Sequence, residues 1–298
     1  MFQTLFAAML FAVGIALGAD ETKNIVVRVN GTAITSGDLE FAASTHQIKP
    51  EERPAREAKL IEELIDRQLI REFLSKRKFT APTDELAYQI QLAEDAIRKH
   101  GDDPATLLPR LGYTPDRLKS ELGLPLAWQA YVRQTVTLPQ TRDYYEQHRA
   151  ELDGTQIKAR QIFLKLPSKA AESEIDPAKK RLTDLRNQIT SGKISFADAA
   201  RKFSESPTRD QGGDLGTIGF RGKLPAPVAK AAFSLNINEI SEPVVSAFGV
   251  HLIQVTERIP GELSLEDVRP QIFERLSDQL WTETVHRERQ SAKIELTK

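Results

Sequence analysis

One histidine stands out among the few residues that could do chemistry. His251 lies in a run, residues 250–255, where it alternates with Ile253 and Val255 as side chains do on a strand. An imidazole titrates near neutral pH and can act as a general acid or base. The same position also suits a histidine that is packed in a core. The pattern of residues by itself leaves both interpretations open.

The other side chains fit no familiar catalytic or metal-binding arrangement. The chain contains no cysteine, which excludes a disulfide scaffold, a thiolate zinc site and a cysteine nucleophile. It also lacks the G-x-S-x-G, H-E-x-x-H and Walker patterns. The remaining histidines are scattered without the spacing of metal ligands: His46, His100, His148 and His286. We therefore expect neither a metal nor a cofactor.

A glycine-rich stretch, residues 204–224, is the second feature that suggests function. Glycine is used where the backbone must adopt a positive φ or pass close to another group. Five glycines fall within eleven positions: Gly212, Gly213, Gly216, Gly219 and Gly222. This density predicts a shaped loop that carries function rather than a passive connection.

The elements around His251 and the glycine-rich stretch predict a mixed domain, one sheet with helices packed on it. The predicted elements are a strand at 158–166, a helix from Asp176–Pro177 to Gly192, a helix after a capping box at 195–198, a short helix at 228–233, and strands at Val244 and 250–255.

The flanking regions have helical patterns. The predicted elements are a strand and turn at 25–34, a capping box at 35–38 that opens a helix, helices at 56–74, 82–100 and 114–132, a shorter helix after Pro139, a long helix from a capping box at 264–267 to about Ala292, and a strand at 293–296. A lone helix and strand cannot bury their own apolar faces. We therefore expect the C-terminal segment to pack on the N-terminal half, with residues 294–296 beside 25–29.

The predicted fold class is α+β, a discontinuous helical domain with an inserted sheet domain. The 298 residues carry 41 basic and 42 acidic side chains, so no global field attracts nucleic acid. The predicted parts are a signal peptide at 1–19, a helical domain at 20–153, the sheet domain at 154–260, and a C-terminal helix and strand at 261–298 that pack on the helical domain.

Residues 1–19 have the composition of a secretory leader. They contain no charged side chain and end in small residues before Asp20. We expect cleavage after Gly18 or Ala19, with an uncleaved anchor as the alternative because the leader has no lysine or arginine. No later segment is apolar enough to cross a membrane. The mature protein is therefore expected to be extracytoplasmic, in the periplasm, without stable membrane insertion.

Six segments of the central domain share an order and spacing with a known family. They are residues 159–163, 196–204, 212–216, 231–235, 243–244 and 248–253. In these segments the domain resembles the parvulin family of peptidyl-prolyl cis-trans isomerases. The leader and the flanking helical regions resemble those of the extracytoplasmic chaperone-isomerases of the SurA and PrsA type.

The resemblance implies an apolar pocket for a proline ring. Its walls would be Leu215, Leu224, Val228 and Phe233, where parvulins usually have Leu, Met, Phe and Phe, and Phe248 would also contact the substrate. Val228 in place of a phenylalanine makes one wall thinner.

The resemblance also implies four polar residues at the centre of the site. His251 takes the place of the second of two histidines common in parvulins, and Gln161 that of the first. Ser206 occupies the position often held by Cys or Asp, and Ser246 that of a Thr or Ser. Neither Gln161 nor Ser206 titrates near neutral pH. Gln161 can still donate a hydrogen bond to His251 and hold its orientation.

Two functions follow from these residues. The first is an isomerase that assists the folding of exported proteins by binding proline in an apolar pocket and stabilising the twisted imide. The second is a non-catalytic or weakly active holdase whose parvulin domain only binds peptides. In both, the expected partners are unfolded or proline-containing exported polypeptides.

Overall fold

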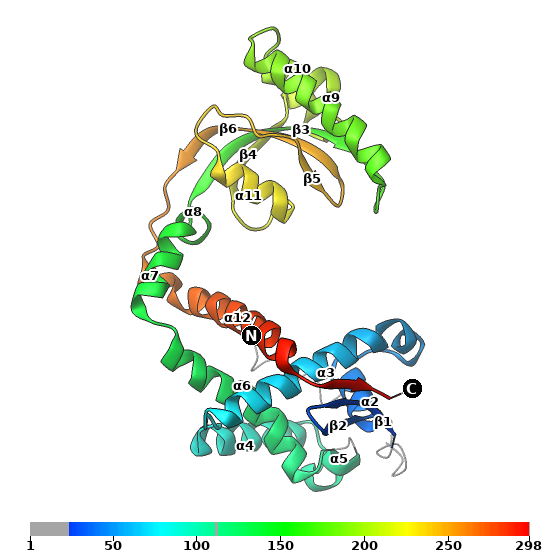
Figure 1. Cartoon of the computed structure of the whole chain (residues 1–298). Helices are drawn as coiled ribbons and strands as arrows, with labels where there is room; N and C mark the ends of the chain where they lie inside the picture. The colour runs from blue at the N-terminus through cyan, green and yellow to red at the C-terminus, as the bar shows by residue number, and fades with distance from the viewer. Residues whose placement is uncertain (1–23, 111–112, 298) are drawn as a thin grey trace. The chain divides into compact units, whose positions relative to one another are not determined.

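The chain forms two compact units in the computed structural model, which describes residues 24–110 and 113–297 (Figure 1). One unit combines the chain up to Thr137 with the segment from Phe273 onward, and the other is Leu138–Ile272. The first unit is therefore discontinuous in sequence. The predicted signal peptide lies outside the described residues, and the predicted domain boundaries after residues 153 and 260 stay a proposal.

The first unit consists mainly of helices, with one small sheet (Figure 1). Its elements are β1 (Ile25–Val29), β2 (Thr32–Thr35), α2 (Ser36–Thr45), the 3₁₀ helix η2 (Pro50–Glu52), α3 (Arg53–Lys76), α4 (Thr83–Lys99), α5 (Pro104–Arg110), α6 (Pro115–Thr135), most of α12 (Leu265–Ser291) and β7 (Ile294–Leu296).

The small sheet joins the two ends of the described chain. Its strand order is β2-β1-β7, with both pairs antiparallel. Asn30 and Gly31 form the tight turn between β1 and β2, with φ of 49° and 88°. Val29 lies opposite Ile294, which confirms the predicted pairing of the C-terminal strand with the first strand.

Helix α12 packs on α3 and α6 of the N-terminal half, the part of the chain on which the C-terminal segment is expected to pack. The rings of Trp128 on α6 and Trp281 on α12 meet edge to face, with centroids 5.0 Å apart. The Trp128 Nε1 also donates to Ser277 Oγ at 3.0 Å. The Thr35 hydroxyl accepts from the backbone N–H of Asp38, so the predicted capping box at the start of α2 is confirmed.

The second unit is a four-stranded antiparallel sheet with helices on both faces. Its elements are α7 (Leu138–Gln147), α8 (Arg149–Leu152), β3 (Gln156–Lys165), α9 (Glu172–Thr190), α10 (Phe196–Phe203), the 3₁₀ helix η3 (Arg209–Gln211), β4 (Asp214–Gly219), α11 (Ala226–Ser234), β5 (Val244–Ser246), β6 (Gly249–Ile259) and the first residues of α12. The strand order is β4-β3-β6-β5.

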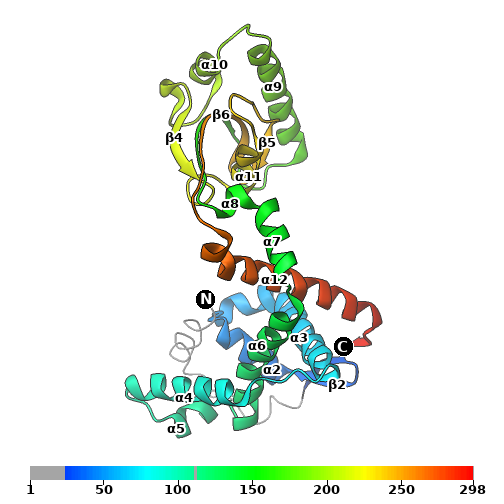
Figure 2. The same ribbon diagram turned by 90° about the vertical axis from the view of Figure 1, so that its left-hand side faces the viewer.

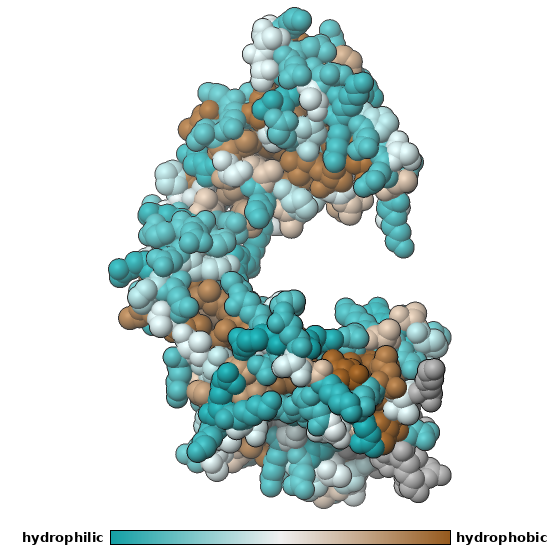
Figure 3. Space-filling model, in the orientation of Figure 1, coloured by the Kyte–Doolittle hydropathy of each residue, from teal (hydrophilic) through white to brown (hydrophobic). Residues whose placement is uncertain are grey.

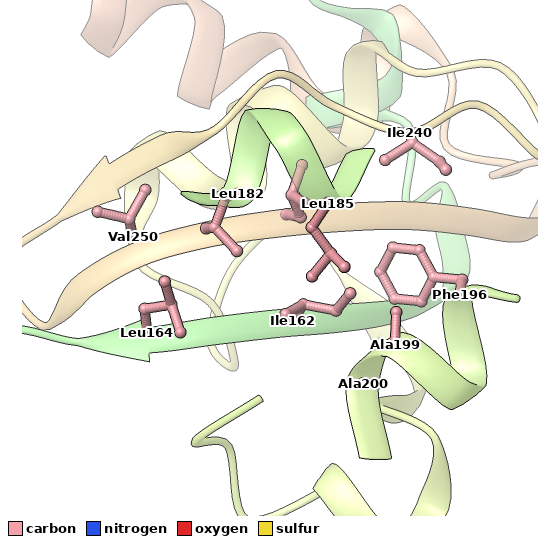
Figure 4. Close-up of a cluster of buried hydrophobic side chains, with 10 residues drawn as sticks. Ile162, Leu164, Leu182, Leu185, Phe196, Ala199, Ala200, Ile240 and Val250 are labelled. Atoms are coloured by element: carbon pink, nitrogen blue, oxygen red, sulfur yellow. The ribbon is translucent and has the colours of Figure 1, made fainter. Parts of the chain in front are cut away.

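Two hydrophobic clusters fill the two sides of this sheet. Helices α9 and α10 cover one face and α11 lies on the other, as both ribbon views show (Figures 1 and 2). Figure 4 shows the first cluster, in which Ile162 of β3 meets Leu182 and Leu185 of α9 and Phe196 of α10. The second cluster packs Val228 and other α11 side chains on the opposite side of β3 and β6.

The predicted start of one helix in this unit is wrong. Helix α9 begins at Glu172 rather than at Asp176, because the carboxylate of Glu174 caps the backbone N–H of Ala171 at 3.0 Å. Pro177 lies inside the helix, where it removes one backbone hydrogen bond.

The glycine-rich stretch is only partly a loop. Residues Asp214–Gly219 form the edge strand β4, and Ile218 pairs with Ile157 of β3. Glycine weakens a strand on its own. The ladder to β3 and the burial of Ile218 stabilise this strand, and neither is visible in the local sequence.

Candidate active site

The register of β3 and β6 places the polar residues on one face of the sheet. Phe163 lies opposite His251, and Gln161 lies opposite Ile253. Residues two apart on a strand face the same side, so these four side chains share the face that α11 covers. The Phe163 and His251 rings lie with their centroids 4.6 Å apart, tilted by 30°.

The four polar residues expected at the site form one continuous chain of hydrogen bonds. The Nε2 atom of His251 is 2.8 Å from Ser246 Oγ, and its Nδ1 is 3.3 Å from Gln161 Oε1. The Nε2 of Gln161 donates to Ser206 Oγ at 3.0 Å. The expected direction of the Gln161 bond is wrong, because the amide oxygen, an acceptor, faces His251.

The backbone around this chain is held in place by short contacts. The carbonyl of Gly213 accepts from the N–H of Gln161 at 2.8 Å. Gly213 has a φ of 80°, and a Cβ there would lie 2.2 Å from the Gln161 carbonyl oxygen. The glycine is required at this point because the loop passes too close to β3 for any side chain. Ser204 Oγ accepts from the N–H groups of Phe163 and Ser206, at 3.1 and 3.2 Å.

The imidazole of His251 is neutral at physiological pH. Its exposed fraction is 5%, and burial lowers the pKa of His251 to about 4. Gln161 and the two serines also carry no charge near neutral pH. The site therefore offers neutral hydrogen-bonding groups in a desolvated setting.

The apolar residues expected to line a pocket belong to the cluster on the same face. Leu215 and Leu224 are half-buried and pack against the cluster that contains Val228 and Phe233. Val228 is fully buried and Phe233 nearly so, and Phe233 meets Phe220 edge to face at 5.2 Å. The accessible apolar surface here therefore comes from the partly buried residues of the cluster, which include Leu215, Phe220 and Leu224.

Phe248 is placed differently from the other apolar residues. It lies in the turn between β5 and β6, and 63% of its side chain is exposed. Its N–H donates to Ser246 Oγ at 3.1 Å, so the turn adjoins the polar chain. Figure 3 shows hydrophobic areas on the surface of this unit, between hydrophilic side chains.

The structure adds residues that the sequence reasoning missed. Thr208 Oγ1 lies 3.1 Å from Ser206 Oγ and extends the polar chain. The ring of Phe163 lies tilted against the imidazole of His251, and the ring of Phe220 meets that of Phe233 edge to face. The period of a strand already places Phe163 on the face of Gln161. Thr208 follows Ser206 by two positions, the spacing at which a serine oxygen accepts from a nearby backbone N–H, so a local turn signal could have indicated this contact.

Neither a metal centre nor a membrane span is found in the part of the chain that the structure describes. No group of three His, Cys, Asp or Glu side chains among residues 24–110 and 113–297 could hold a metal ion. No helix in these ranges is long and apolar enough to cross a bilayer.

Comparison with known proteins gives a consistent result. The family model of the PPIC-type PPIase (rotamase) domain matches residues 162–257. Over 125 residues the chain is 39% identical to the chaperone SurA of Bordetella parapertussis, an alignment that covers 41% of this chain and 23% of that protein. It is 27% identical over 217 residues to the foldase protein PrsA 4 of Bacillus cereus, which covers 71% of this chain and 69% of the relative.

The similarity extends beyond the sheet domain. A crystal structure of the peptidylprolyl isomerase PrsA from Bacillus cereus matches with a TM-score of 0.50 and 21% identity, over 94% of this chain and 95% of the other. At this identity the match shows a common fold. The chain spans about a quarter of the length of the SurA relative.

Proposed function

We propose that this chain, whose residues 162–257 form a PPIC-type peptidyl-prolyl isomerase domain of the parvulin type, accelerates the cis-trans isomerisation of X-Pro bonds in polypeptides. The observation that carries the proposal is the neutral polar chain through His251, Gln161, Ser206 and Ser246 on the face of the sheet where Leu215 and its neighbours form an apolar surface.

The reaction needs binding of a twisted imide rather than covalent chemistry. Amide resonance gives rotation about the bond a barrier of roughly 18–20 kcal/mol. A site that binds the twisted form better than either planar form lowers this barrier. The proline ring would pack on Leu215 and Leu224. One N–H of the Gln161 amide is used by Ser206, which leaves the second to donate to the rotating carbonyl oxygen.

Substitution of His251 tests this site. We expect His251→Ala to reduce kcat/KM for a short proline peptide roughly tenfold, about 1.4 kcal/mol of transition-state stabilisation, because the variant loses the group that links Ser246 to Gln161. Lys193→Ala, an exposed change in the loop after α9, serves as the control and should keep full activity.

Equal losses in the two variants would mean that the site lies elsewhere. A wild-type rate equal to that of buffer alone, from a folded sample, would contradict the enzymatic function.

A second function, a holdase whose parvulin domain only binds peptides, is favoured by two observations. Gln161 and Ser206 stand where parvulins commonly have a histidine and a cysteine or aspartate, and Val228 adds no accessible wall to the pocket because it is fully buried. The helical unit would then hold unfolded segments, and it has hydrophobic cores of its own.

Excision of the sheet domain separates the two functions. The backbone N–H of Leu263 donates to the carbonyl of Asp153 at 2.9 Å, so the two ends of the inserted domain lie side by side. A variant lacking residues 155–260 can therefore be closed without a long linker. We expect it to keep the ability to prevent aggregation of an unfolded test protein. Loss of that ability, in a folded variant, would contradict a holdase function of the helical unit.

The proposed clients are unfolded or proline-containing exported polypeptides, and the proposed location is the periplasm after removal of a signal peptide. The uncharged, apolar run at residues 1–19 supports this location. N-terminal sequencing of the mature protein should begin at Ala19 or Asp20. A protein that begins at Met1 and stays bound to the membrane would instead show an uncleaved anchor.

A further inference from the structure

The hydroxyl of Ser206 has a fully determined set of hydrogen bonds. A serine hydroxyl has two lone pairs and one proton. Its Oγ accepts hydrogen bonds from the Nε2 of Gln161 at 3.0 Å and from the backbone N–H of Thr208 at 3.3 Å. Both lone pairs are then occupied, so the proton must be donated, and Thr208 Oγ1 is the acceptor at 3.1 Å. Ser206 is only 4% exposed, so water is a poor substitute.

The orientation of the Gln161 amide determines which nitrogen of His251 carries the proton. Because the amide nitrogen faces Ser206, its oxygen faces Nδ1 of His251, and Nδ1 must donate. Burial keeps the imidazole neutral, with a pKa of about 4, so Nε2 has a free lone pair. Ser246 Oγ then donates to Nε2 at 2.8 Å. All donors point the same way, from Ser246 toward Thr208.

A reversed chain is the competing arrangement. If the Gln161 amide flips, Ser206 donates to its oxygen, its nitrogen donates to Nδ1 of His251, and Nε2 donates to Ser246. The Ser246 proton must then go to the carbonyl of Gly249, which is 3.4 Å away, a long contact. The first direction depends instead on Thr208 Oγ1, which accepts the Ser206 proton at the other end of the chain across 3.1 Å.

We propose that Thr208 is a positioning residue that keeps His251 in its Nδ1–H tautomer by accepting the proton of Ser206. The hydrogen bonds that transmit this effect run through Ser206 and Gln161. The tautomer assignment stands on these contacts alone, and only its consequence for isomerisation rests on the proposed function.

The test is the ¹⁵N NMR spectrum of the His251 imidazole at pH 7 in the full chain. The two tautomers of a neutral histidine have well-separated nitrogen shifts. We expect the wild type to show a protonated Nδ1. In Thr208→Val the acceptor is lost while the shape is kept, so the amide should flip and the proton should move to Nε2. Thr208→Ser restores an acceptor and should give the wild-type spectrum.

Thr183→Val, a change at a half-buried position on α9, is the matched control and should leave the His251 signals unchanged. A wild type that carries the proton on Nε2 would overturn the proposal without any variant. So would a Thr208→Val protein that keeps Nδ1–H.

Isomerase kinetics test separately whether Thr208 affects catalysis. We expect Thr208→Val to lower kcat several-fold at nearly constant KM, since the residue does not line the apolar surface, and Thr208→Ser to recover it. If the wild type has no isomerase activity, the proposed function fails, whereas the NMR result still decides the role of Thr208. An active Thr208→Val protein with a switched tautomer and unchanged kcat would contradict the link to catalysis.

Discussion

At the scale of single residues, His251 combines the two interpretations that its sequence context leaves open. It is packed in the interior, against the ring of Phe163, and it is also a member of the polar chain that runs from Ser246 to Thr208. Its neighbours in this chain, Gln161 and Ser246, are neutral at all ordinary pH values. Neither of these neighbours is a carboxylate that would offset the charge of an imidazolium, and burial lowers the pKa of His251.

Because His251 is buried, we expect acid to destabilise the fold. The pKa of His251 is about 4 in the folded protein, against 6.5 for a histidine in water, so the unfolded chain binds the proton more strongly. His251 therefore leaves the free energy of unfolding unaffected above about pH 6.5 and lowers it as the pH falls from there toward 4. The loss from this group should reach about 2 kcal/mol at pH 5. Urea unfolding at pH 7, 6 and 5 measures it.

His251→Gln should remove this part of the pH dependence while other groups keep theirs. The difference in unfolding free energy between the wild type and the variant should therefore change by about 2 kcal/mol over the same range. Parallel curves for the two proteins would show that His251 does not titrate in this way.

At the scale of elements, the glycine-rich stretch is a frame for the polar chain. It contains Ser206 and Thr208, passes against β3 at Gly213, and then becomes the edge strand β4. Gly213 and Gly216 both have a left-handed backbone, with φ of 80° and 65°. They differ in their surroundings, because Gly213 abuts the Gln161 carbonyl while nothing lies within 4 Å of a Cβ at Gly216.

This difference predicts unequal costs for two alanine substitutions. Gly216→Ala should lower the free energy of unfolding only by the cost of a left-handed backbone at alanine, about 1–2 kcal/mol. Gly213→Ala should lower the free energy of unfolding by more than that, about 3 kcal/mol or above, because the loop must also move away from β3. Urea unfolding of both variants measures the costs. Similar losses would show that the loop can shift freely and is not a rigid frame.

At the scale of the whole molecule, the returning C-terminal segment closes the helical unit. Strand β7 pairs with β1 and helix α12 lies against α3, where Arg289 contacts Asp66 and Glu62 at 2.7 Å each. Segments more than two hundred residues apart in sequence therefore form one core. The sheet domain has its own separate clusters.

Removal of the C-terminal strand should destabilise the helical unit and leave the sheet domain unchanged. Removal of residues 293–298 uncovers Val27 and Val29, which are fully buried, and should reduce the hydrogen-exchange protection of β1, β2 and α3. The protection of β3 and β6 should stay unchanged. Hydrogen-deuterium exchange with mass spectrometry measures both.

The reciprocal variant, Leu182→Ala, creates a cavity beneath α9 and should cost about 2–5 kcal/mol in the sheet domain alone. If either change reduces protection equally in both units, the two cores are coupled and this division of the molecule is wrong.

Most elements could be predicted because their signals are local. Capping residues such as Thr35 and Ser195 mark helix starts, and helical spacing marks apolar faces. The start of α9 and the strand β4 could not be predicted in the same way. Asp176–Pro177 has the residue types of a helix start, but the cap at Ala171 lies upstream, and β4 depends on its pairing with β3.

Residue types and their local order are enough to specify many features of this protein. The helices, most strands, the resemblance to parvulins and the neutral character of Gln161 and Ser206 belong to this class. The burial and pKa of His251, and the hydrogen bonds that join Gln161 to His251 and Ser206, are set only by the folded arrangement. Desolvation and hydrogen-bond direction depend on partners brought together by folding, here 45 and 90 residues apart in the chain.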